Sequence, residues 1–243
     1  MDFDAFERTI FQNWGNHYHC PTENLNQPGT EWIPIERWDG KELVRFRYVH
    51  RRTFLEFDPH LAGYLKSASA GRPAGTALRA DDLAPIDGWK VIARDSTLYH
   101  YLYAADLPAI QPLAPLELRQ LTAQDAGLMQ ALHAANPPAE VEAGCVEVDD
   151  DLAFGCLADG QLAAAASAFD YIGFMDVGVL THPDYRKRGL GRAAVRALCA
   201  GLVERGSLPQ YRCDAANIAS VNLARSLNFR LYVTEEELMV RAA

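Results

Sequence analysis

A glycine-containing loop between a strand and a helix constrains this chain more than any other part of its sequence. Residues 174–181 are apolar and β-branched, as a strand requires, and residues 189–205 carry apolar side chains at helical spacing. Gly189 and Gly191 stand where the helix opens, and four of the seven residues 186–192 are basic. Because the free N–H groups of a helix N-terminus favour an anion, this loop predicts a phosphate or pyrophosphate site.

Length and charge limit the other possibilities. The 243 residues are 49% hydrophobic, which is enough for a packed core and excludes a disordered chain. Lys and Arg number 23 against 32 Asp and Glu, so the net charge of −9 disfavours binding to nucleic acid. There is no apolar run of about 20 residues, and Met1-Asp2-Phe3-Asp4 lacks the basic start of a secretory signal. We therefore expect a cytoplasmic protein that binds neither nucleic acid nor membrane.

The five cysteines do not form a recognisable framework. Their number is odd and no pair has the Cys-x-x-Cys spacing, which indicates reduced thiols. The group most similar to a metal site is His17-Tyr18-His19-Cys20, but the sequence offers no second half for it. We predict a polar loop there and no metal.

The composition changes along the chain and indicates two domains. Residues 108–115 hold three prolines in eight positions, which is typical of an extended linker. This predicts an N-terminal α+β domain of unknown role at 1–107 and a second domain at 116–243. In the first domain we expect a helix at 4–14, one or two strands within 42–57, and strands at 89–93 and 97–103.

The second domain has a more regular pattern of elements. We expect strands at 116–119, 152–158, 162–170, 174–181 and 210–213, helices at 122–135, 189–205 and 220–227, and a final hairpin from 229–232 and 238–240. Asp159-Gly160 is a strong hairpin turn signal, so the strands from 152 to 181 form an antiparallel meander.

Two other phosphate-binding loops compete with this interpretation. A Walker loop requires Gly-Lys-Ser/Thr, and the sequence has no such tripeptide. Gly189-Leu-Gly191-Arg-Ala-Ala194 satisfies the dinucleotide fingerprint, with Asp214 at a suitable distance. However, seven residues, 182–188, separate the strand from the glycines, and only 29 residues follow Asp214. That is too few to complete a doubly wound sheet.

The loop resembles the acetyl-CoA signature of the GNAT superfamily of N-acetyltransferases. Arg186-Lys-Arg-Gly189-Leu-Gly191 fits the pattern Gln/Arg-x-x-Gly-x-Gly/Ala, and residues 217–229 are similar to the family's second segment. Asn228 replaces the glycine of that segment, and asparagine adopts positive φ more readily than most residues. The resemblance covers about 116–243. It implies an α/β (α+β) fold with a mixed, mostly antiparallel central sheet flanked by helices, beside an extra N-terminal α+β domain.

The resemblance also implies which residues bind acetyl-CoA as a cosubstrate. The backbone of the strand end would pair with the pantetheine arm, the loop would hold the pyrophosphate, and the second segment would contact pantetheine. These residues are Val179, Leu180, Thr181, Arg186, Lys187, Arg188, Gly189, Leu190, Gly191, Arg192, Asn217 and Ser220. A backbone amide near Val179 or Leu180 would stabilise the oxyanion.

The catalytic groups that the family implies are less well matched. An amine would attack the thioester directly, and a base would remove its proton. The tyrosine that many members use as general acid corresponds to Ala224 here, so Tyr232 or Tyr185 would have to replace it. Asp176, on the strand before the loop, and Glu147 are the candidate bases.

The resemblance predicts an acetyl-CoA-dependent N-acyltransferase that acts on an amine of a small molecule or a peptide. Two alternatives remain open. In the first, which Ala224 motivates, the chain is a CoA-binding module with weak or no catalysis. In the second, it is an interaction protein that uses its tryptophan-rich N-terminal half. The identity of the amine is not encoded in any motif, and a homodimer is plausible.

Overall fold

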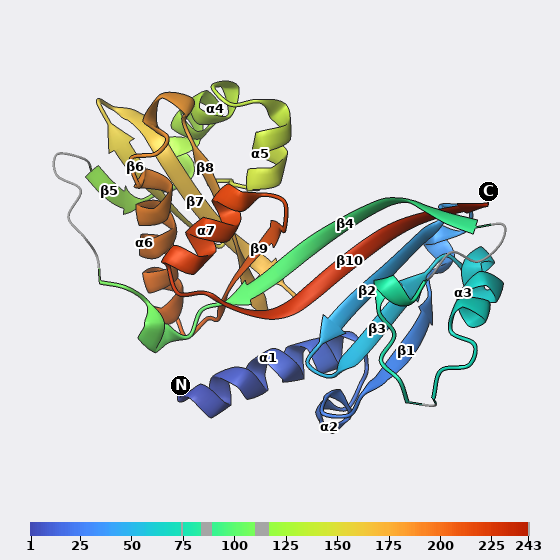
Figure 1. The fold of residues 1–243 in the computed structure, drawn as a ribbon. Coiled ribbons are helices and arrows are strands. Elements are labelled where there is room, and N and C mark those ends of the chain that lie inside the picture. Colours follow the sequence, from blue (N-terminus) through green and yellow to red (C-terminus); the bar gives the residue numbers. More distant parts are fainter. Residues whose placement is uncertain (74, 84–88, 110–116, 243) are drawn as a thin grey trace. The chain divides into compact units, whose positions relative to one another are not determined.

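The computed structural model describes residues 1–73, 75–83, 89–109 and 117–242 (Figure 1). The chain divides into two compact units, which are treated separately below. The first contains Met1–Tyr99, Cys213–Ile218 and Leu231–Ala243, and the second contains His100–Arg212 and Ala219–Arg230. Most of the predicted linker 108–115 falls outside the described ranges, and the domain boundaries 1–107 and 116–243 stay predictions. No helix within these ranges has the length and apolar character needed to cross a membrane.

The first unit is a sheet with helices. Its elements are α1 (Phe3–His17), α2 (Thr22–Leu25), β1 (Gly29–Pro34), β2 (Leu43–Val49), β3 (Arg52–Phe57), α3 (Ala62–Ala68) and most of β4 (Trp89–Tyr101) and β10 (Arg230–Ala242). The strands follow the order β1-β3-β2-β10-β4. β1 pairs in parallel with β3, and β2 pairs antiparallel with both β3 and β10.

Two strand predictions in this unit were wrong in the same way. The predicted strands 89–93 and 97–103 are one strand, β4. The predicted hairpin from 229–232 and 238–240 is also one strand, β10, because its residues from Val233 to Met239 pair with β2. Two of the three consecutive glutamates of β10, Glu235 and Glu237, lie opposite Arg47 and Arg45 of β2.

A buried ion pair joins β2 to β10. Arg47 is only 3% exposed, and its Nε donates a hydrogen bond to Glu235 at 2.8 Å. The Tyr99 hydroxyl donates to the same carboxylate at 2.8 Å, and the Arg47 guanidinium lies 5.1 Å from the centre of the Trp14 ring. Burial raises the pKa of Glu235, but the charges of Arg47 and Arg45 outweigh it and hold the pKa below its usual value. The pair is therefore fully charged and satisfied inside the unit.

The second unit has a mostly antiparallel sheet with helices on both faces (Figure 1). Its elements are β5 (Glu117–Gln120), α4 (Ala126–Ala134), α5 (Pro138–Gly144), β6 (Leu152–Ala158), β7 (Gln161–Tyr171), β8 (Phe174–Thr181), α6 (Leu190–Glu204), most of β9 (Pro209–Asp214) and α7 (Ile218–Ser226). The strand order is β9-β8-β7-β6-β5, and only β8 and β9 are parallel. The predicted fold class and meander are confirmed.

The alternation of β8 assigns one helix to each face of this sheet. On one face, Leu180 packs in a buried cluster with Met129 and Leu132 of α4. On the other face, Thr181 and Val179 approach the first turn of α6 so closely that only glycine fits there. Because side chains alternate along a strand, the residues of β8 contact α4 and α6 in turn. This places the start of α6 directly against the end of β8.

The buried ion pair of the first unit should be a major source of its stability. Replacing Glu235 with glutamine leaves Arg47 buried without a counter-charge, so we expect Glu235→Gln to lower the free energy of unfolding by about 3 kcal/mol. The matched control is Glu237→Gln on the same strand, whose side chain is 33% exposed and pairs with Arg45. It should cost about 1 kcal/mol or less. Urea unfolding followed by circular dichroism measures both, and equal effects would contradict the prediction.

Candidate functional site

The loop between β8 and α6 has the backbone of an anion site. After the short 3-10 helix Pro183–Tyr185, Lys187 and Gly189 both adopt left-handed backbone conformations, with φ of 61° and 80°. α6 then begins at Leu190, and no side chain caps it. The first N–H groups of a helix have no partner within the helix, so those of α6 are open to a ligand. The loop therefore has a backbone suited to an anion, and phosphate binding there stays a prediction.

The two glycines of the loop have different structural roles. Gly189 permits the left-handed turn, and a Cβ added to it would meet no atom within 4 Å. Gly191 is buried, and a Cβ added to it would lie 2.7 Å from Thr181 Oγ1. Gly191 thus sets the close packing of α6 on β8.

Of the four basic side chains of the loop, one forms an ion pair and three do not. Arg186 donates hydrogen bonds to Asn136 Oδ1 at 2.7 Å and to Glu140 Oε2 at 2.5 Å. Glu140 lies on α5 and Asn136 just before it, so Arg186 joins the loop to the start of α5. Lys187, Arg188 and Arg192 are exposed and form no ion pair with any residue that the structure describes. They leave a net positive charge around the open end of α6.

Beside this loop, β8 loses its pairing with β9. The two strands share only the register pairs Met175–Pro209 and Asp176–Gln210. On its other edge β8 stays paired with β7 as far as Thr181. The predicted pantetheine-binding residues, from Val179 to Thr181, therefore lie beyond the point where β8 and β9 separate.

Asp176 is held at that point of separation. It is 5% exposed; Gln210 Nε2 donates to one carboxylate oxygen at 3.0 Å, and an Arg212 N–H donates to the other at 2.8 Å. Burial raises the pKa of Asp176 above its usual value, although the Arg212 charge and the two hydrogen bonds act against this shift. Gln210 Oε1 is buried and has no hydrogen-bond partner among the described residues. The site thus holds a proton-accepting group and an unused acceptor.

The second candidate base, Glu147, lies in a more open environment. Its side chain is exposed, and its backbone N–H donates to Ser167 Oγ at 3.0 Å. The Ser167 hydroxyl donates to Asp150 at 2.5 Å, and burial raises the pKa of Asp150. The structure therefore places a second protonatable carboxylate three residues from Glu147.

The remaining predicted residues lie elsewhere along the chain. Asn217 and Tyr232 belong to the first unit, and Ser220 on α7 belongs to the second. The Tyr232 hydroxyl donates to Glu7 at 2.8 Å, and the ring packs on Phe6. Their functional roles stay predictions.

Sequence reasoning missed three polar residues that the structure brings to the site. Asn136 holds Arg186, while Gln210 and Arg212 hold Asp176. A signal was available for the last two, because they are polar residues at alternate positions of a strand that is otherwise largely buried. No local pattern marks Asn136.

Comparison with known proteins gives a family match and similar solved structures. Residues 152–234 match the family model of the GNAT acetyltransferases. An acetyltransferase of the GNAT family from Colwellia psychrerythraea is similar in fold, with 82% of each chain covered, 16% identity and a TM-score of 0.50. A protein from Novosphingobium aromaticivorans, assigned to the GNAT family, is 27% identical over 66% of this chain and 70% of its own, with a TM-score of 0.48. Among curated proteins, none matches the chain.

The contact between Gly191 and Thr181 can be tested by stability. We expect Gly191→Ala to lower the free energy of unfolding by about 1–3 kcal/mol, because the added methyl group overpacks the joint between α6 and β8. In a Thr181→Ala background the same change should be neutral or stabilising, since the clash is gone and alanine favours a helix. A double-mutant cycle in urea measures this coupling. Equal costs in both backgrounds would contradict the assigned contact.

Proposed function

Because the C-terminal part of the chain belongs to the GNAT superfamily of acetyltransferases, we propose that the protein moves an acetyl group from acetyl-CoA to the amine of a small molecule or a peptide. One observation carries the proposal. The uncapped N-terminus of α6, reached through left-handed Lys187 and Gly189, lies against the end of β8 beyond its last pair with β9. An extended cosubstrate with a pyrophosphate group needs both features together.

Acetyl-CoA would supply an activated acetyl thioester. In the proposal, the backbone of Val179, Leu180 and Thr181 pairs with its pantetheine arm, and the amides from Gly189 to Gly191 bind its pyrophosphate. Lys187, Arg188 and Arg192 add charge, with Asn217 and Ser220 as further contacts. Arg186 has a different part, because its hydrogen bonds to Asn136 and Glu140 already commit it to holding the loop.

Transfer requires a neutral amine, since an ammonium group has no lone pair for attack. The amine nitrogen bonds to the carbonyl carbon, the carbon–sulfur bond breaks, and the sulfur leaves with a proton. We assign Asp176 to take the proton that the nitrogen releases, directly or through one water. The raised pKa of Asp176 makes it a stronger base than an ordinary aspartate. Glu147 is the alternative base, and Tyr232 stays the predicted acid.

Ligand-induced stabilisation tests the cosubstrate. Acetyl-CoA at 100 times its Kd should add about 2.7 kcal/mol, or roughly 5–10 °C in Tm, whereas NAD and ATP should add little. The double variant Lys187→Glu/Arg188→Glu should lose most of this shift, because it places negative charge beside the pyrophosphate. Lys41→Glu/Lys66→Glu makes the same change in net charge at exposed positions of the first unit and should keep it. No shift with the parent chain, or equal shifts in both variants, would reject the assigned site.

The pH dependence of turnover tests the base. Asp176 must be ionised to accept a proton, so the rate should fall as the pH drops through its pKa, which lies above that of an ordinary aspartate. Asp176→Asn should lower kcat by about 100-fold or more and remove this acidic limb. Glu147→Gln is the matched control and should preserve both kcat and the acidic limb of the pH profile. If Glu147→Gln removes the limb instead, the base is Glu147. Binding of acetyl-CoA without turnover on any amine would favour the CoA-binding module.

A further inference from the structure

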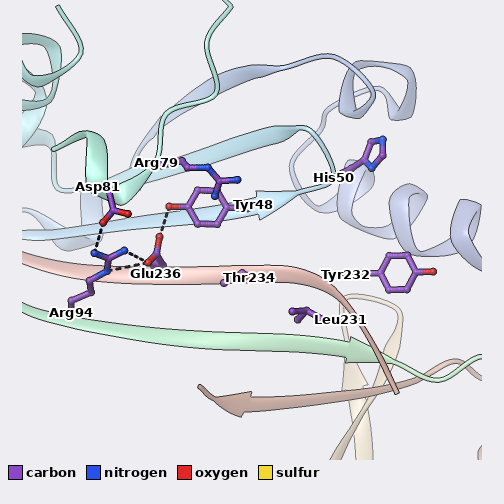
Figure 2. A pocket seen from close by; sticks show the side chains of 9 residues that line it. All are labelled: Tyr48, His50, Arg79, Asp81, Arg94, Leu231, Tyr232, Thr234 and Glu236. Atoms are coloured by element: carbon purple, nitrogen blue, oxygen red, sulfur yellow. Dashed lines mark hydrogen bonds and ion pairs between the residues drawn. The ribbon is translucent and has the colours of Figure 1, made fainter. Parts of the chain in front are cut away.

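The first unit contains a pocket of its own. Its cavity volume is about 420 Å³, which lies within the range of small-molecule sites. The side chains that line it come from β2, the turn after β2, β4, β10 and the segment 79–81, and all of them belong to the first unit (Figure 2). The proposed acetyl transfer uses none of this pocket except Tyr232, the predicted acid.

One end of the pocket is a cluster of paired charges. Arg94 pairs with Asp81 at 2.6 Å, and its Nε donates to Glu236 at 3.0 Å. The Tyr48 hydroxyl donates to the other oxygen of Glu236 at 2.5 Å. Figure 2 shows these contacts as a continuous chain. Arg94 is neutralised by Asp81 and Glu236, so these three side chains form a wall of the pocket. The hydrogen bond from Tyr48 to Glu236 holds the tyrosine ring beside that wall.

Arg79 differs from Arg94 because no described carboxylate forms an ion pair with it. Its guanidinium lies 4.9 Å from the centre of the Tyr48 ring, and it forms no ion pair with any residue in the described ranges. This cation–π contact holds the guanidinium, a planar fork of N–H donors, over the ring of Tyr48. A planar fork of this kind matches a carboxylate or a phosphate, which accept two parallel hydrogen bonds.

Beyond Arg79, the pocket has one exposed aliphatic side chain, Leu231. Leu231 is 51% exposed, one of the few large apolar side chains at this level of exposure in the described chain. Thr234 and His50 line the same pocket (Figure 2). An inorganic ion would contact only Arg79 and leave Leu231 in water. A ligand that carries an apolar body next to its acidic group would cover both.

We propose that this pocket binds a small organic anion, whose carboxylate or phosphate group pairs with Arg79 while its apolar body lies against Leu231. The proposal does not depend on acetyl transfer, because Arg79 and Leu231 have no role in the proposed transfer.

Titration of the full chain, followed by amide chemical shifts in NMR spectra, tests this site. Benzoate and phenyl phosphate represent the two acidic groups, benzyl alcohol lacks the charge, and inorganic phosphate lacks the ring. Both organic anions should shift amides of residues 79–81 and 231–236 with a Kd of about 1 mM or tighter. Benzyl alcohol and inorganic phosphate should bind at least tenfold more weakly. The stronger of the two organic anions identifies the acidic group.

Variants separate the two halves of the site. Arg79→Gln should weaken both anions by about tenfold or more, whereas Arg37→Gln removes an exposed charge outside the pocket and should not. Leu231→Ser should weaken the organic anions and leave inorganic phosphate unchanged. Added salt should weaken the parent chain's binding of benzoate but not of benzyl alcohol, a comparison that needs no variant. Equal affinity in Arg79→Gln and Arg37→Gln, or no shifts with either anion at millimolar concentration, would overturn the proposal.

Discussion

The parallel ladder between β8 and β9 stops after two residue pairs, and the candidate site depends on this early stop. Its last pair, Asp176–Gln210, is also a hydrogen-bonded side-chain pair, and Arg212 reaches the same carboxylate from further along β9. The strands therefore separate at a buried carboxylate, both of whose oxygens accept hydrogen bonds. Beyond it, β8 keeps its pairing with β7 only, so the strand end next to α6 has one backbone edge that β9 does not use.

Two contacts then set the position of the loop relative to β8. The first is steric, since the missing side chain of Gly191 lets α6 approach Thr181. The second is ionic, since Arg186 joins the loop to Asn136 and Glu140. One arginine of the basic run therefore positions the loop, whereas Lys187, Arg188 and Arg192 form no ion pair with the described residues and keep their charge for a ligand. A run of like charges can thus hold residues with different physical roles.

The sequence predicted those parts of the structure that depend on neighbours along the chain. The bounds of β8, the start of α6 and the turn at Asp159-Gly160 follow from local periodicity and turn chemistry, and Asn228 adopts positive φ as expected. The errors concern distant partners. Glu235 and Arg47 are 188 residues apart, so nothing local showed that a run of glutamates would continue a strand. Gln210 and Arg212 are polar residues on a largely buried strand, which is a local signal, but their role shows only through their contact with Asp176.

The pairing of β10 with β2 also has a consequence for how the chain acquires its structure during synthesis. β2 leaves the ribosome long before Glu235 exists, so Arg47 has no counter-charge in the nascent chain. The sheet of the first unit has β10 between β2 and β4, and it cannot close until β10 is made. The elements of the second unit from β5 to β9 lie between these strands in the sequence and have no such delay. We therefore expect the second unit to be the earlier of the two to mature, although it comes later in the chain.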